Sequence, residues 1–252
     1  MARVDLPVQH FQGRDGAELA YREVGEGRPL VLIHGFFSNG FVNWIKYGHA
    51  AALAERGFRV VMPDLRAHGE SAKPHEASAY YPDMLAEDGE ALLEHLGLTD
   101  YDLGGYSLGA RTVVRMLVRG ARPRRAIVAG MGLDGMLHPL RNRQHFLDVL
   151  TATEAYPHGT PEFLTQAFLR TTGGDPKALV HVVDTQVANS PADLAAIDVP
   201  TAVILGTEDD NGSGPGLADA LGEGYFLPIP GTHMGAVTRP ELAAAIGDFL
   251  TD

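Results

Sequence analysis

A serine between two glycines is the residue of this chain best suited to act as a nucleophile. Residues 105–109 read Gly-Tyr-Ser-Leu-Gly, and residues 111–119 carry apolar side chains at helical spacing. At a turn from a strand into a helix, this arrangement is a nucleophile elbow: it exposes the serine hydroxyl beside backbone N–H groups that favour developing negative charge. The same five residues are also compatible with an ordinary glycine-rich turn. Ser107 is therefore a candidate that the rest of the chain must support.

A serine nucleophile needs a base, and the base needs an acid to orient it. The chain contains 11 histidines, so position has to select among them. His233 follows directly after the last expected strand, 225–229, and Asp209 follows the expected strand 201–205. Because an open parallel sheet carries its site at the carboxyl ends of the strands, we expect both side chains to lie near Ser107.

The acid has two competitors in the sequence. Residues 210–216 read Asp-Asn-Gly-Ser-Gly-Pro-Gly and are expected to be flexible, which leaves Asp210 as an alternative to Asp209. Asp134, which comes shortly after the expected strand 126–129, is a further alternative. With Asp209 the order along the chain is Ser, Asp, His, the order that accompanies a nucleophile elbow.

The elements around these residues predict an α/β fold with a mostly parallel sheet of about eight strands and helices on both faces. Short apolar or alternating segments predict strands at 8–12, 19–24, 29–33, 58–62, 101–104, 126–129, 201–205 and 225–229. Amphipathic patterns predict helices at 41–56, 81–96 and 240–250, besides the helix after Ser107. The first two strands are expected to form a hairpin at one edge of the sheet.

The alternation of strands and helices stops at residues 134–199. This section is too long for an ordinary connection and contains no credible strand. We expect it to be a helical cap inserted into a core made of 1–133 and 200–252. Helical patterns occur at 143–150, 161–170 and 175–187. Their apolar side chains, most of which are expected to hold the cap together, are Phe146, Leu147, Leu150, Phe163, Phe168 and Leu169.

Composition argues against several classes of function. The formal net charge of −12 disfavours binding to nucleic acid or to an anionic membrane, because both need a basic surface. The absence of cysteine removes disulfides and thiolate metal sites. The N-terminus lacks the apolar core of a secretory signal, and no apolar run approaches the length of a membrane span. We therefore expect a cytoplasmic protein without membrane insertion; the sequence leaves the oligomeric state open.

One glycine pattern could suggest a dinucleotide site. Residues 130–135 read Gly-Met-Gly-Leu-Asp-Gly after an expected strand. That interpretation needs a helix that opens at the third glycine, and Pro139 argues against one. No other nucleotide or metal motif occurs, so we expect neither a cofactor nor a metal.

Several motifs together resemble those of the α/β-hydrolases. They span most of the chain outside the expected cap and are His34-Gly35-Phe36, residues 64–71, residues 105–109, residues 206–209 and residues 230–233. The resemblance implies that Ser107 attacks a carbonyl carbon, that His233 takes its proton and that Asp209 holds the imidazolium. It further implies that the backbone N–H groups of Phe36 and Leu108 form the oxyanion hole. Thr232 departs from the glycine that many members carry before the catalytic histidine.

The residues around these motifs have less definite roles. The ring of His34 is expected to brace the turn that aims the Phe36 N–H, and Arg66 and His68 are expected to brace their loop, although both could touch a substrate carboxylate. Phe36 and Phe37 are candidates for lining a substrate pocket. The expected partner is a small-molecule substrate with an apolar acyl part.

The leading hypothesis is a serine hydrolase that cleaves a carboxylic ester, thioester or lactone through an acyl-enzyme on Ser107. An alternative is hydrolysis of a carbon–carbon bond beside a carbonyl by the same residues. A third interpretation, from a different class, is a small-ligand receptor that has kept the three residues. A serine at the elbow separates the chain from the epoxide-hydrolase and haloalkane-dehalogenase branches, which the resemblance ties to an aspartate nucleophile.

Overall fold

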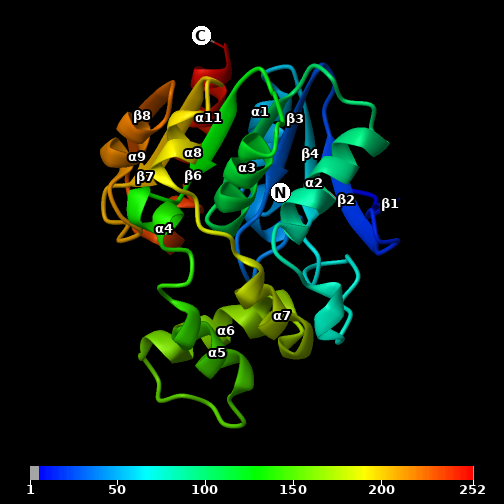
Figure 1. Cartoon of the computed structure of the whole chain (residues 1–252), viewed down its shortest axis with the longest axis vertical. Coiled ribbons are helices and arrows are strands. Elements are labelled where there is room, and N and C mark those ends of the chain that lie inside the picture. Colours follow the sequence, from blue (N-terminus) through cyan, green and yellow to red (C-terminus); the bar gives the residue numbers. More distant parts are fainter. Residues whose placement is uncertain (1–5, 252) are drawn as a thin grey trace.

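A twisted sheet of eight strands forms the centre of the molecule, shown as a computed structural model that describes residues 6–251 (Figure 1). The strand order is β1-β2-β4-β3-β5-β6-β7-β8. β2 runs antiparallel to both of its neighbours, β1 and β4, and every other neighbouring pair is parallel. The strands are β1 (Gln9–Gln12), β2 (Glu18–Val24), β3 (Arg28–Ile33), β4 (Phe58–Asp64), β5 (Asp102–Tyr106), β6 (Ala126–Ala129), β7 (Thr201–Gly206) and β8 (Gly224–Ile229). The predicted fold class is confirmed, including the edge hairpin.

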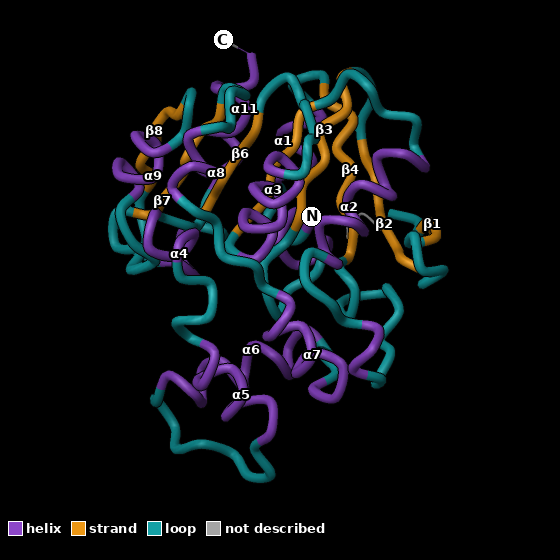
Figure 2. The backbone as a smooth tube through the Cα atoms, viewed as in Figure 1, coloured by secondary structure: helices purple, strands orange, loops and turns teal. Residues whose placement is uncertain are grey.

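Helices cover both faces of this sheet (Figures 1 and 2). One face packs against α2 (Met84–His95), α3 (Leu108–Val118), α8 (Pro191–Ala195) and α9 (Gly214–Ala220), and the other against α1 (His49–Ala54) and α11 (Pro240–Thr251). β3 shows why the central strands read as unbroken apolar runs. Val31 and Ile33 belong to the core under α2 and α3, whereas Leu30 and Leu32 belong to the core under α1 and α11. Successive side chains point to opposite faces, and here both faces are buried.

The segment 41–56 does not form the single helix that its apolar pattern predicts. It forms a short π-helix, Phe41–Ile45, followed by α1. Gly48 separates them with φ 85°, a left-handed conformation that glycine adopts without strain and that ends a helix. The spacing of apolar residues indicates which side chains are buried, but it does not show whether the helix is interrupted between them.

Short helices also occur where the apolar pattern is too brief to predict them. α9 begins inside the run 210–216 that was expected to be flexible: the Ser213 hydroxyl accepts a hydrogen bond from the Gly216 N–H, and a proline occupies the first turn. A five-residue helix, α4 (Leu133–Leu137), begins within the glycine pattern 130–135, where Pro139 argued against a helix, but it ends before that proline. α8, α10 (His233–Ala236) and a single 3-10 turn, Ala77–Ala79, are further short helices that the sequence did not predict.

Three helices from the section 134–199 form a separate layer beyond the carboxyl ends of the central strands (Figure 2). They are α5 (Arg143–Thr151), α6 (Pro161–Thr172) and α7 (Pro176–Val182), and no strand lies among residues 134–199. α4 and α8, from the ends of the same section, pack instead against α9 and α3 beside the sheet. The division into a core of 1–133 and 200–252 and a cap of 134–199 stays a prediction. Within residues 6–251, no helix has the length and apolar character needed to cross a bilayer.

The close crossing of α3 over β3 gives a test of this packing. A Cβ added to Gly109 would lie 2.2 Å from the Ile33 carbonyl oxygen, where both partners are backbone atoms that cannot rotate away. We expect Gly109→Ala to lower the free energy of unfolding by about 2–3 kcal/mol, as measured by urea denaturation.

Gly97→Ala is the matched control for this substitution. Gly97 has φ 62° but no atom within 4 Å of the added Cβ, so its cost reflects backbone conformation alone, about 1 kcal/mol. Equal losses in the two variants would contradict the steric account.

Candidate active site

Ser107 stands at the sharp turn between β5 and α3. Its φ of 57° and ψ of −111° lie in a region that residues other than glycine rarely occupy. A Cβ on Gly105 would lie 2.3 Å from the Gly109 carbonyl carbon, and one on Gly35 would lie 3.3 Å from the Ser107 Cβ. The turn after β3, the end of β5 and the start of α3 therefore meet at Ser107.

His233 and Asp209 reach Ser107 from the loops that follow β8 and β7. His233 Nε2 lies 3.1 Å from the Ser107 Oγ, and His233 Nδ1 lies 2.9 Å from Asp209 Oδ2. The Asp209 side chain is fully buried, whereas the His233 imidazole keeps a quarter of its surface exposed, 25%. The Tyr106 hydroxyl donates to the His233 carbonyl at 2.7 Å and ties this loop to β5. The structure thus joins three side chains from distant parts of the chain in one hydrogen-bonded line.

The Asp209 carboxylate, which Asn211 holds in place, determines which way the proton on His233 faces. Asn211 Nδ2 lies 2.8 Å from His233 Nδ1, and both the backbone N and the Nδ2 of Asn211 donate to Asp209 Oδ1, at 3.0 and 2.9 Å. An amide nitrogen can only donate and a carboxylate can only accept, so the Nδ1 proton faces Asp209. In the neutral imidazole this leaves Nε2 as the acceptor for the Ser107 hydroxyl.

The Asp209 carboxylate is held in its charged form despite its burial. Burial alone would raise the pKa of Asp209, but hydrogen bonds and charge from His233, together with the two donors of Asn211, outweigh it and bring the pKa below its ordinary value. A buried carboxylate kept ionised in this way can stabilise positive charge on the imidazole.

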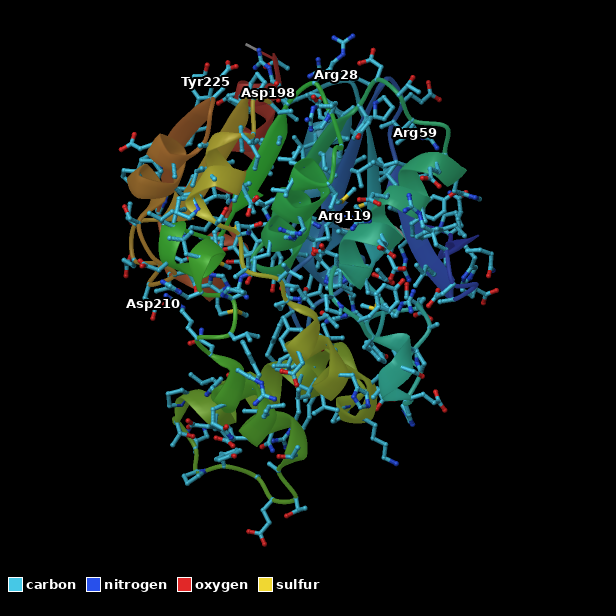
Figure 3. All side chains as sticks on the ribbon, viewed as in Figure 1. Arg28, Arg59, Arg119, Asp198, Asp210 and Tyr225 are labelled. Atoms are coloured by element: carbon cyan, nitrogen blue, oxygen red, sulfur yellow. The ribbon has the colours of Figure 1, made fainter. Side chains whose placement is uncertain are left out.

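Neither of the two alternative acids touches His233. Asp210 is exposed at the border between the sheet and helices α5–α7 (Figure 3), and its backbone carbonyl accepts a hydrogen bond from Arg141. Asp134 lies on α4 against the backbone of Gly212. Within residues 6–251, no His, Cys, Asp or Glu side chains gather in a group of three or more that could hold a metal ion.

Two backbone N–H groups beside Ser107 have no acceptor. Among the described residues, neither the Phe36 N–H nor the Leu108 N–H donates a hydrogen bond to another group. Both residues line the same cavity as Ser107. Unpaired N–H groups at the start of a helix and in an adjoining turn are available to an oxygen that carries negative charge.

Two buried histidines hold the turn that carries the Phe36 N–H. His34 accepts a hydrogen bond at Nε2 from the Leu65 N–H and lies 2.7 Å from the Gly35 carbonyl through Nδ1. His68 accepts at Nε2 from the N–H of Phe37, a residue held at φ 61°. Burial lowers the pKa of His34 to about 4 and, with the neighbouring His34 ring, that of His68 to about 3. Both rings are therefore neutral braces in this geometry.

Arg66 also serves the loop after β4. Its guanidinium is fully buried and pairs with Asp15 and Asp88 at 2.6 and 2.8 Å, and it donates to the Ala79 carbonyl. Neither Arg66 nor His68 lines the cavities at Ser107. The sequence left open that these two residues contact a substrate carboxylate. In this arrangement they hold their loop and do not face the cavities.

Ser107 lies where two cavities meet. The larger has a volume of about 420 Å³ and extends under the helices of residues 134–199; the smaller has about 140 Å³ and lies toward the π-helix. The residues common to both are Phe36, Ser107, Phe168, His233 and Met234. A molecule whose reacting atom lies at the Ser107 hydroxyl can therefore extend in two directions.

Aromatic side chains join the turn after β3 to helix α5. The rings of Phe36 and Phe37 stack with centroids 4.2 Å apart, and the Phe146 ring meets both edge-on at 5.1 and 5.7 Å. Phe36 borders both cavities, and Phe37 borders the larger one although it is nearly buried. Both phenylalanines line the cavity, as do Phe146 and Phe168 of α5 and α6, and contact of Phe36 and Phe37 with a substrate stays a prediction.

Comparison with known proteins supports the fold described above. A family model described as the alpha/beta hydrolase fold matches residues 28–131, which include the turn after β3, the loop after β4 and the Ser107 turn. A solved hydrolase from Pseudomonas aeruginosa PA01 superposes with a TM-score of 0.80 at 24% sequence identity, over 97% of this chain and 98% of the other. The chain has the α/β-hydrolase fold, and its residues 28–131 match the family model of that fold.

The proteins similar to this chain differ in activity. A non-heme haloperoxidase of Rhodococcus erythropolis is 33% identical over 58% of this chain and 47% of its own length, so the chain spans less than half of that relative. A non-heme chloroperoxidase of Kitasatospora aureofaciens is 28% identical over 78% of this chain and 79% of its own length. Similar proteins also include esterases, an enol-lactonase and epoxide hydrolases. These similarities therefore support a hydrolase without selecting its substrate.

Two residues of the site have no counterpart in the sequence-based prediction. Asn211 sits in the run expected to be flexible, although its spacing from Asp209 is that of an aspartate whose side chain bonds the backbone two residues on. Arg111 lines the larger cavity one helical turn after Ser107. Residues one turn apart share a face of a helix, so this position could have been found from the elbow.

The histidine brace gives a pH-dependent test. We expect His68→Gln to lower the free energy of unfolding of the protein at pH 7 by about 1–3 kcal/mol, because buried backbone groups lose their partner. This deficit should shrink as the pH falls from 7 to 5. The depressed pKa of His68 means that only the unfolded wild type takes up the proton in this range, which costs the wild type about 1.4 kcal/mol per pH unit below about 6.5.

The measurement is urea denaturation of both proteins at several pH values. A deficit that stays constant or grows toward pH 5 would show that His68 is not a neutral buried brace.

Proposed function

We propose that this protein is a serine hydrolase that cleaves a carboxylic ester, thioester or lactone through an acyl-enzyme on Ser107. The observation that carries the proposal is the continuous line from the Asp209 carboxylate through His233 to the Ser107 hydroxyl, with contacts of 2.9 and 3.1 Å. Nucleophile, base and orienting acid in hydrogen-bonding reach are what acyl transfer at a serine requires.

In the first step Ser107 Oγ attacks the carbonyl carbon and His233 Nε2 takes the hydroxyl proton. Asp209 holds the Nδ1 proton and stabilises the imidazolium that forms. The developing oxyanion is bound by the N–H groups of Phe36 and Leu108, whose lack of internal acceptors supports this role. The tetrahedral intermediate then collapses, and His233 returns the proton to the departing alcohol, thiol or ring oxygen.

In the second step a water molecule attacks the acyl-enzyme. His233 Nε2 takes a proton from the water, the new oxyanion occupies the same two N–H groups, and the carboxylic acid leaves as Ser107 recovers its proton. The apolar lining of the larger cavity, from Phe36, Phe37, Phe146 and Phe168, suits the apolar acyl part of a small-molecule substrate.

Ser107→Ala tests the nucleophile. With p-nitrophenyl hexanoate as substrate, we expect the variant to lose kcat by about 10⁴-fold or more, because no other group forms the covalent intermediate. A fluorophosphonate probe, followed by intact-mass spectrometry, should add one adduct to the wild type and none to the variant. An unlabelled wild type would count against a serine hydrolase and favour a small-ligand receptor.

Asp209→Asn and Asp210→Asn form a matched pair for the acid. We expect Asp209→Asn to lower kcat by about 10⁴-fold, because an asparagine no longer holds the imidazole in its working tautomer. Asp210→Asn removes the same charge from the neighbouring residue, which makes no contact with His233, and should change kcat by about twofold or less. Because Asp210 borders the larger cavity, the two variants are compared by kcat at saturating substrate and not by KM. A comparable loss in both variants, or the larger loss in Asp210→Asn, would refute the assignment.

A further inference from the structure

Arg111 brings a positive charge into the larger cavity without a carboxylate to neutralise it. The side chain lies on α3, one turn beyond Ser107, and lines the cavity beside Leu108. Its Nη1 donates to the Pro139 carbonyl at 3.0 Å, and its buried Nε has no hydrogen-bond acceptor among the described residues. No Asp or Glu of residues 6–251 lies within ion-pair distance of this guanidinium.

The acidic groups nearest to this region are engaged elsewhere or face outward. Asp83 borders a small crevice next to Arg111 but is bound by Arg115 through two contacts of 2.7 Å. Asp184 holds Arg143, another cation of the cavity lining, at 2.6 and 2.9 Å. Asp210 borders the same cavity and is exposed to solvent. None of them neutralises Arg111.

Other charges near Arg111 do not compensate it either. Burial and, to a lesser degree, the charge of Arg141 lower the pKa of Arg111 to about 10, so the group stays protonated at neutral pH. Arg141 itself donates only to neutral acceptors, the Asp210 carbonyl and the Asn211 side-chain oxygen. His145 also lines the cavity and lies 3.7 Å from Glu162.

A largely desolvated charge without a partner is costly to the folded protein. The chain has 32 Asp and Glu residues against 20 Lys and Arg residues, so carboxylates that could pair with Arg111 are plentiful in its composition. A guanidinium in this setting is suited to a carboxylate supplied from outside, because charge-assisted hydrogen bonds to Arg are strong and directional.

We propose that Arg111 binds a carboxylate of the substrate, so that the preferred substrates are esters that carry a second, negatively charged group. This inference rests on the proposed hydrolase function for the identity of the reacting group. Successive turns of α3 separate the Ser107 and Arg111 backbones by about 6 Å along the helix axis. The charged end of the substrate therefore lies a few carbon atoms from the reacting carbonyl, inside the larger cavity, while the other substituent of the carbonyl enters the smaller one.

Binding to the inactive Ser107→Ala protein tests the carboxylate site without turnover. The probes are monomethyl adipate, which carries one carboxylate, and dimethyl adipate, its neutral counterpart. By isothermal titration calorimetry we expect the monomethyl ester to bind more tightly. Arg111→Gln in the same background keeps a donor for the Pro139 carbonyl but removes the charge, and should weaken binding of the monomethyl ester by about 10- to 100-fold and reduce its advantage over the dimethyl ester.

Arg119→Met is the matched control. Arg119 directly follows the last residue of α3 (Figure 3), pairs with Glu87 and Glu90, and borders neither cavity. The substitution removes the same charge at the far end of the helix and should leave both dissociation constants unchanged. Arg111→Met repeats the test if the glutamine variant does not fold, as judged by circular dichroism. The inference is overturned if the two esters bind equally well to Ser107→Ala, or if the Arg111 variant weakens both by the same factor.

Turnover separates this inference from the proposed function. For the wild type we expect a higher kcat/KM with mono-p-nitrophenyl adipate than with its methyl ester, and a ratio that falls about 10- to 100-fold in Arg111→Gln. Hydrolysis of both esters without preference would retain the serine hydrolase and refute the carboxylate site. Arg111-dependent binding without any hydrolysis would refute the hydrolase and retain the site.

Discussion

The close approach of backbones around Ser107 is the constraint on which the rest of the site depends. The first turn of α3 lies against the end of β3, and a side chain at Gly109 would collide with the Ile33 carbonyl. This contact forces Ser107 into a rarely occupied conformation and places it beside the turn at Gly35. The unpaired N–H groups of Phe36 and Leu108 then flank the hydroxyl, because the two elements that carry them are in van der Waals contact.

Neutral, buried hydrogen bonds keep this contact rigid. His34 and His68 connect the turn after β3 to the loop after β4, and their rings lie 5.0 Å apart. Burial disfavours the charged form of both rings, and two charged imidazoles at this distance would also repel each other. Both rings are therefore neutral. On the other side, Phe146 packs its ring against Phe36 and Phe37. The turn after β3 thus carries the Phe36 N–H group, forms one wall of the cavity and contacts α5.

Charge is distributed unevenly between the outside of the molecule and its cavity. The chain as a whole is acidic, with a net charge of −12, yet the cavity at Ser107 contains a guanidinium that no described carboxylate neutralises. Around His233 the situation is reversed, since the Asp209 carboxylate is stabilised by His233 and Asn211. The cavity thus holds one charge with a partner, at Asp209, and one without, at Arg111.

The sequence by itself determined the order of the strands along the chain, the helical section between residues 134 and 199, and the positions of Ser107, Asp209 and His233 at strand ends. These features follow from local apolar patterning and turn residues, which act over a few neighbours. The tertiary structure decided what depends on contacts in space: that Asp209, and not Asp210 or Asp134, meets His233; that Asn211 lies beside both of them; and that residues 41–56 break at Gly48. Only the tertiary structure shows that Arg111 is a cation of the cavity without a described carboxylate partner. Whether a side chain has such a partner depends on all the residues around it in space, and the residues next to it in the sequence do not reveal this.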